Sequence, residues 1–255
     1  MTRDERRAAL EQIANEVRGC SACRLAGGRT RAVPGEGDPD TEVVFVGEGP
    51  GFNEDREGRP FVGRAGALLV RLLGSIGWRR EDVFITNVVK CRPPDNRDPQ
   101  PDEIAACAPF LRRQLEVLDP AVVVTLGRHS MATFMPGARI GQVHGTTRQA
   151  DPATGARDAL VFAMYHPAAA LRTPALERES FQDISSVPAV LQQSRDGRTA
   201  GADSPPVTRP ATDQHAEGAS RPASASEVPP AAASAPTPPA EAPAPADDAS
   251  QLTLF

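Results

Sequence analysis

Four short apolar segments alternate with helical segments over the first 195 residues, and this alternation constrains the fold more than any other feature. The segments are rich in valine and isoleucine and span residues 42–47, 82–87, 121–126 and 159–164. Strands that are apolar at every position are typical of a parallel sheet that is buried on both faces. We therefore expect an α/β fold with a central four-stranded parallel sheet covered by helices.

The positions of the polar residues relative to these segments predict where a ligand binds. In open parallel sheets, ligands bind outside the carboxyl ends of the strands. A glycine-rich stretch follows the first segment, Asn87 ends the second, and His166 follows the fourth. Helices are predicted over residues 4–20, 66–76, 101–118, 128–134 and 174–191.

The composition changes after about residue 195. From Gly201 to Ser250 the chain has eleven prolines and fifteen alanines, and it has no Phe, Trp or Tyr between Phe181 and Phe255. Such a segment cannot bury enough apolar surface to offset its chain entropy. We expect a folded domain over residues 1–195, a disordered Pro/Ala-rich acidic linker over 196–250 and a separate motif at 251–255.

The net charge of −5 resides in the tail. Residues 1–200 carry 26 basic and 26 acidic side chains, whereas the remainder carries 2 and 7, so the charge does not exclude an anionic partner for the domain. The start, MTRDERRAAL, lacks the apolar core of a signal peptide, and no apolar run reaches the ~20 residues that span a membrane. We expect a cytoplasmic protein without structural disulfides.

Two segments near the predicted strand ends could carry chemistry. GEGPGFNEDREGRPFVGRAG, residues 47–66, has six glycines, which allow close approach of the backbone to a ligand. Such a loop at the head of a helix could also bind phosphate, but GxGxG alone is weak evidence and there is no Walker lysine. A tight strand-to-helix turn with solvated acids explains the segment equally well from the residues alone. His166, in YHPAAALR, could donate a hydrogen bond to a developing anion or be a surface histidine in a turn.

All four cysteines fall within the first 107 residues, and two of them form a CxxC pair. Four thiolates are the ligand set of a structural zinc site or of an iron–sulfur cluster, and the spacing does not choose between them. Buried free cysteines are the simplest alternative. The residues are Cys20, Cys23, Cys91 and Cys107.

Several ordered motifs together resemble the family 4 uracil-DNA glycosylases: GEGPG, ED, GRPFVGRAG, ITNVVKCRPPDNR and HPAAALR. The resemblance covers residues from Cys20 to about Leu191. It implies a three-layer α/β/α sandwich, a monomer, and a monofunctional hydrolase that removes uracil from single- or double-stranded DNA in base excision repair. It also implies a [4Fe-4S] cluster held by Cys20, Cys23, Cys91 and Cys107.

The resemblance further implies a pocket for a uracil that is flipped out of the DNA. Phe61 would stack on the ring, and Asn87 would read its Watson–Crick edge, because an amide both donates and accepts. Glu54 would crowd position 5 of the base, so that the methyl group of thymine clashes. Backbone groups would line the rest of the pocket, at Glu48, Gly49 and Pro50.

For the chemistry, the resemblance implies that His166 stabilises the uracil anion as it leaves. Another uracil glycosylase family carries a water-orienting aspartate where this chain has Gly49. We therefore expect Glu48, with Asn96 behind it, to hold the attacking water here.

The resemblance also suggests contacts with DNA outside the pocket. Leu171 is expected to wedge into the gap that the flipped base leaves. Arg172 and Arg92 are expected to contact phosphates.

The last five residues, QLTLF, resemble the pentapeptide by which bacterial DNA-repair proteins bind the sliding clamp. The residues expected to bind are Gln251, Leu252, Leu254 and Phe255. Two alternatives to a turning-over glycosylase are a relative that captures uracil-DNA covalently through a loop histidine and a non-catalytic iron–sulfur adaptor. The segment from Arg92 to Gln100 has no histidine, and the retained Asn87 and His166 disfavour an adaptor.

Overall fold

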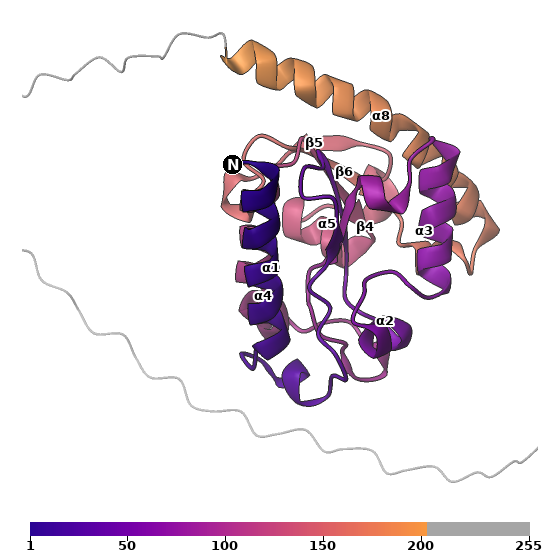
Figure 1. Cartoon of the computed structure of the whole chain (residues 1–255). Coiled ribbons are helices and arrows are strands. Elements are labelled where there is room, and N and C mark those ends of the chain that lie inside the picture. The colour runs from indigo at the N-terminus through magenta and orange to yellow at the C-terminus, as the bar shows by residue number, and fades with distance from the viewer. Residues whose placement is uncertain (203–255) are drawn as a thin grey trace, which may run out of the picture. The chain divides into compact units, whose positions relative to one another are not determined.

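A six-stranded sheet forms the centre of the computed structural model, which describes residues 1–202 (Figure 1). The four inner strands pair in parallel in the order β3-β2-β4-β6, and β1 and β5 pair antiparallel at the two edges. The strands are β1 (Glu36–Gly37), β2 (Val43–Gly47), β3 (Phe84–Asn87), β4 (Val122–Leu126), β5 (Thr147–Gln149) and β6 (Leu160–Met164).

The inner strands confirm the prediction of a central four-stranded parallel sheet, and each lies within two residues of its predicted start. β2, β3 and β4 are buried at every position, in agreement with their mainly apolar sequences; the polar exceptions are Thr86, Asn87 and Thr125. The edge strands β1 and β5 were not predicted. They have two and three residues, all of them exposed or half-buried, so they carry no alternating pattern that a sequence could reveal.

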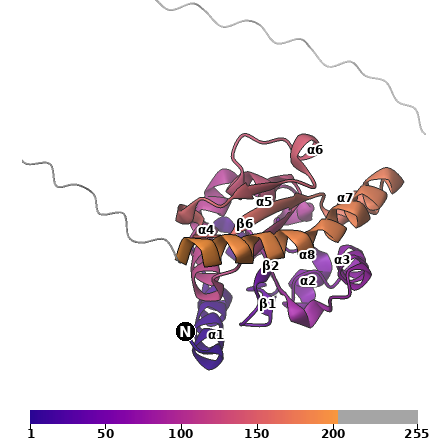
Figure 2. The same ribbon diagram turned by 90° about the horizontal axis from the view of Figure 1, so that it is seen from above.

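Helices cover both faces of the sheet, as the three-layer sandwich requires (Figure 1). One apolar cluster joins the sheet to α1 (Arg3–Gly19), α4 (Pro101–Leu118) and α5 (Arg128–Phe134). The other joins it to α3 (Arg64–Ser75), α7 (Pro167–Ala170) and α8 (Pro174–Ala202). Figure 2 shows α8 crossing the molecule along this second face.

The remaining helices in residues 1–202 are short. Two are α-helical, α2 (Phe52–Glu57) and α6 (Ile140–Val143). Four are 3₁₀ turns, η1 (Arg24–Gly27), η2 (Arg80–Asp82), η3 (Pro94–Asn96) and η4 (Pro152–Thr154).

Helix ends follow local chemistry where the sequence provides it. Thr2 caps α1, because its hydroxyl accepts from the Glu5 amide and the Glu5 carboxylate accepts in return. α4 begins at Pro101, where the missing N–H of proline costs nothing. α8 continues past the predicted end near Leu191, so residues 196–202, expected to begin the linker, are helical.

The rest of the predicted linker and the QLTLF end lie outside the described residues. In residues 1–202, no helix is long and apolar enough to cross a membrane.

Candidate active site

A cavity of about 560 Å³ opens at the carboxyl ends of the parallel strands. Its size is typical of small-ligand pockets. Each inner strand contributes lining residues at or just after its end: Glu48 after β2, Asn87 in β3, Gly127 after β4 and His166 after β6. The predicted residues that line it are Glu48, Gly49, Pro50, Glu54, Phe61, Asn87, Asn96, His166 and Arg172.

Gly47 lies in close contact with Asn87 and Phe61, two residues that line the cavity. A Cβ atom on Gly47 would lie 2.7 Å from the Phe61 ring and would also collide with the Asn87 amide oxygen. Glycine is therefore required here for close approach of the two side chains. Phe61 itself has φ +50°, a rare conformation for a bulky residue, and its carbonyl accepts a hydrogen bond from Arg80.

Asn87 is 1% exposed and lines the cavity. Within residues 1–202, neither its amide nitrogen nor its amide oxygen has a hydrogen-bond partner. Leaving a buried polar group unpaired costs about 1–3 kcal/mol, so such a group calls for an explanation. An amide beside a cavity, with one donor and one acceptor free, fits a ligand that offers the complementary pair.

His166 is held in one tautomer by the backbone. Its Nδ1 accepts from the Ala168 N–H at 3.0 Å, so a neutral ring carries its proton on Nε2. Burial, with a smaller contribution from the charge of Arg172, lowers the pKa of His166 to about 4. The ring is therefore neutral at pH 7 and is a hydrogen-bond donor without a charge.

Two neighbours fix the position of the His166 ring. It stacks on Phe61 with 5.8 Å between ring centroids. On the other side Gly127, at φ +91°, lies so close that a Cβ there would be 2.8 Å from the His166 Cβ. Phe61 and His166 thus present an aromatic wall to the cavity.

Glu54 has its carboxylate tied to the backbone. Oε1 accepts from the N–H groups of Val62 and Gly63 at 2.9 and 3.0 Å, and Oε2 accepts from Gly51 at 3.1 Å. These bonds close the loop around α2, the short helix that the glycine-rich stretch was not predicted to contain. Glu54 therefore lines the cavity as a fixed rather than a mobile carboxylate.

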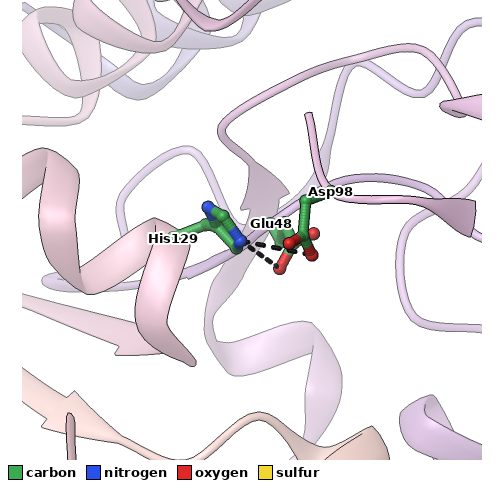
Figure 3. Close-up of side chains that lie close together, drawn as sticks. All are labelled: Glu48, Asp98 and His129. Carbon is green, nitrogen blue, oxygen red and sulfur yellow. Dashed lines mark ion pairs between the residues drawn. The ribbon is translucent and has the colours of Figure 1, made fainter. Parts of the chain in front are cut away.

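Glu48 lies beside two side chains that the sequence analysis did not identify, Asp98 and His129 (Figure 3). His129 Nε2 is 3.3 Å from Asp98 Oδ1 and 3.9 Å from Glu48 Oε2. Burial raises the pKa of Glu48 above its ordinary value. Asn96, expected behind Glu48, lines the same cavity, and its amide oxygen accepts from Arg92 at 2.7 Å.

Gly49 cannot be exchanged for a larger residue without a shift of its surroundings. A Cβ there would lie 2.7 Å from a methyl group of Val89. Any side chain at this position would need Val89 to move.

Two of the residues expected to contact DNA do not line the cavity. Leu171 follows α7 and packs partly against the second apolar cluster. The guanidinium carbon of Arg92 lies 5.3 Å from the centroid of the Phe52 ring, and that of Arg56 lies 5.6 Å from the same centroid. Phe52 is 52% exposed, an aromatic flanked by arginines that no motif indicated.

The four cysteines line a second, smaller cavity, and all of them are free thiols. Hydrogen-bond donors face the sulfurs: Arg29 Nη1 lies 3.2 Å from Cys91 Sγ, and the Lys90 N–H lies 3.3 Å from Cys107 Sγ. Burial raises the pKa of the Cys107 thiol to about 11 and also raises the pKa of the Cys91 thiol. Both thiols are therefore protonated at pH 7 when no metal is bound to them. A thiolate-bound metal group fits this donor set, and the geometry does not separate zinc from iron–sulfur.

Comparisons with known proteins agree with the geometry. The model of the uracil DNA glycosylase superfamily matches residues 34–185. A type-4 uracil-DNA glycosylase of Saccharolobus solfataricus is 50% identical over 188 residues, 71% of this chain and 86% of that protein. One of Thermotoga maritima is 44% identical over 194 residues, 75% of this chain and 98% of that protein.

A more distant match is a type-5 uracil-DNA glycosylase of Thermus thermophilus, 37% identical over 120 residues, which are 41% of this chain and 54% of that protein. The type-4 proteins are thus matched with higher identity and over more of their length. This chain belongs to the uracil-DNA glycosylase superfamily and, within it, to the type-4 uracil-DNA glycosylases.

Proposed function

We propose that the cavity at the strand ends is where this uracil-DNA glycosylase, an N-glycosyl hydrolase of base excision repair, binds a flipped uracil. The amide of Asn87, which has no hydrogen-bond partner within residues 1–202, carries the proposal. Uracil offers a carbonyl acceptor next to an N–H donor on one edge, which is the pair that a carboxamide complements. Cytosine has an acceptor at N3 and a donor at N4, the reverse of uracil, so the same orientation of the amide disfavours cytosine.

The walls of the cavity suit the rest of the base. Phe61, next to the His166 ring, supplies an apolar face on which uracil can stack. Glu54, fixed by three backbone N–H groups, would stand near position 5 and exclude the methyl group of thymine. The backbone at Glu48, Gly49 and Pro50 would close the pocket around base and sugar.

In the reaction, a water oxygen bonds to C1′ of the sugar while the bond from C1′ to uracil N1 breaks. The bonding electron pair leaves with uracil, and the water proton passes to the carboxylate of Glu48. His166 donates from Nε2 to the uracil oxygen on which negative charge develops. Because the ring is neutral, the donor needs no prior protonation at pH 7.

Contacts with DNA would lie at the rim of the cavity. Arg172, which lines it, and Arg92 can contact phosphates, and Leu171 can enter the gap in the base stack. Phe52, exposed between arginines, adds a face on which a neighbouring base can stack.

The four cysteines would hold a [4Fe-4S] cluster, by resemblance to the family and because their donor set accepts one. Bound there, a cluster would join the segment after α1 to the segment between β3 and α4, because its ligands come from both. Arg29 and Lys90 place positive charge and N–H donors beside the thiolates.

The test of the function is a labelled oligonucleotide with one uracil, incubated with the protein, treated with alkali and run on a denaturing gel with and without boiling. Strand cleavage at the uracil over many turnovers is expected. A slow-migrating band that survives boiling would indicate covalent capture. Intact oligonucleotide in the presence of protein with a full complement of iron would contradict the proposal.

The C-terminal QLTLF is proposed to bind the sliding clamp. Residues 203–250 would link it to the glycosylase domain and so raise the effective concentration of that domain near the DNA on which the clamp sits. Deleting Gln251–Phe255 should abolish clamp binding and leave uracil release by the domain unchanged. Equal clamp affinity of the deleted and the full chain would reject this part of the proposal.

A further inference from the structure

The mechanism above leaves unexplained why Glu48 has two other titratable side chains beside it. The ligand atoms of Glu48, Asp98 and His129 all lie within 4.8 Å of one another (Figure 3). They come from separate parts of the chain: the loop after β2, the segment before α4, and the first turn of α5. Two carboxylates this close repel each other unless a positive charge lies between them.

His129 is that positive charge when it is protonated. In Figure 3 its ring points at both carboxylates. Its side chain is 19% exposed, and within residues 1–202 its Nε2 is buried without a hydrogen-bond partner, although Asp98 Oδ1 is 3.3 Å away. The nitrogen is thus within ion-pair distance of both carboxylates and is shielded from solvent.

We propose that His129, supported by Asp98, is a positioning residue that keeps Glu48 ionised and oriented to take the proton of the attacking water. The proposal rests on the proposed function, since it assumes that Glu48 is the base. Asp98, 53% exposed, would hold the imidazolium, and Arg128 would hold Asp98 from the other side. Arg128 pairs with Asp98, so a metal cation at this cluster would meet a positive charge.

The electrostatics agree with this role. Burial raises the pKa of Glu48, the charge of His129 opposes the rise, Asp98 adds to it, and Arg128 opposes it. Burial also opposes ionisation of Asp98, but its bond with Arg128 and the charge of His129 keep its pKa low. The other titratable side chains that line the cavity are Glu54, Arg97, Tyr165, His166 and Arg172.

Two of these other groups have partners of their own. Glu54 is bound by backbone N–H groups, and Arg97 pairs with Glu103. His166 stays neutral above about pH 4. His129 is therefore the side chain whose loss should change the ionisation of Glu48 most.

The sign of the effect follows directly. A base must be ionised, so activity falls as the pH drops through the pKa of Glu48. Removing the positive charge of His129 raises that pKa. The acidic limb of the pH–rate profile should therefore move to higher pH by about one unit or more, since an opposite charge at this distance is worth 1–3 units.

The experiment measures single-turnover uracil release at saturating protein from pH 4.5 to 9, for the full chain and for His129→Gln. The expected result is an upward shift of the acidic limb, with the rate of the variant recovering at high pH. His129→Lys, which restores a cation, should bring the limb back toward its original position. A variant that is only misfolded would lose rate equally at every pH.

His144→Gln is the matched control. His144 is another partly buried histidine, paired with Asp183 at 3.0 Å, and this substitution should leave the limb in place. Glu48→Gln separates a failure of the proposed function from a failure of the inference about His129. If the unaltered chain releases no uracil, the proposed function fails. If it does and Glu48→Gln is inactive, but His129→Gln has an unshifted limb, only this inference is overturned.

Discussion

The His166 ring can donate from one nitrogen only, because Ala168 occupies the other. We predict that His166→Ala lowers the single-turnover rate of uracil release by about 10²–10³-fold, the usual cost of removing such a donor. DNA binding should change much less, since the bond is strongest to the leaving anion. His166→Gln, which keeps an N–H donor, should retain more of the rate than the alanine variant. Equal rates for the unaltered chain and His166→Ala would remove this residue from the mechanism.

Gly47 permits the contact between Asn87 and Phe61, and a single methyl group there should disrupt it. We predict that Gly47→Ala weakens binding of uracil-containing DNA by at least tenfold, because the Cβ collides with both side chains. Gly74→Ala in α3 is the matched control, since nothing lies within 4 Å of its Cβ. The control should be neutral or stabilise by up to ~1 kcal/mol. Unchanged uracil-DNA binding by Gly47→Ala would show that Asn87 and Phe61 can move to make room for the methyl group.

Residues that follow a strand could be placed at the cavity from the sequence. Asn87 and His166 stand at ends of apolar segments, so the rule for parallel sheets and the family resemblance both indicate them. His129 also follows β4, but the sequence did not indicate it. Its proposed role depends on its ion pair with Asp98, which lies 31 positions earlier in the sequence. Phe52 likewise gains its role from Arg92 across the fold.

At the scale of elements, the buried lysine joins β3 to α4. Lys90 Nζ donates to Thr86 Oγ1 at 2.6 Å, to the Asn87 carbonyl at 2.8 Å and to Gln114 Oε1 at 2.7 Å. Burial lowers the pKa of Lys90 to about 8. The network thus ties the carbonyl of the proposed uracil-reading residue to the helix behind the sheet.

We predict that Lys90→Met destabilises the fold by about 1–3 kcal/mol, because it leaves buried acceptors without a donor. Denaturant unfolding followed by circular dichroism measures this difference. Thr133→Ala, on the partly exposed face of α5, is a control that removes one local hydrogen bond, from the Thr133 hydroxyl to the His129 carbonyl. A Lys90→Met protein as stable as the parent would contradict the network's structural role.

Elements were predictable in proportion to their length. The four inner strands and the long helices carry enough apolar residues to show a period. The edge strands β1 and β5 and the short helix α2 do not, since two to six residues barely complete one repeat. Strand order was also not predictable, because pairing across the sheet depends on contacts distant in the sequence.

At the scale of the whole molecule, folding stability should depend on pH through His166. The pKa of His166 lies near 4 in the folded protein, below the ordinary 6.5, so the unfolded chain binds more protons between these values. Stability attributable to this group is therefore lost as the pH falls from 6.5 toward 4. We predict that going from pH 7 to pH 5 lowers the midpoint of thermal unfolding more in the unaltered chain than in His166→Gln. Equal losses in both would contradict the burial of this ring.

The central claim is that Asn87 reads uracil with an amide that has no hydrogen-bond partner in the described part of the chain, residues 1–202. The most direct test compares single-turnover uracil release by the unaltered chain and by Asn87→Ala, with thermal unfolding as the check on folding. We predict a folded variant in which uracil release is slower by at least about tenfold, because the hydrogen bonds to the base edge are lost. A folded Asn87→Ala protein that releases uracil at the original rate would contradict the account.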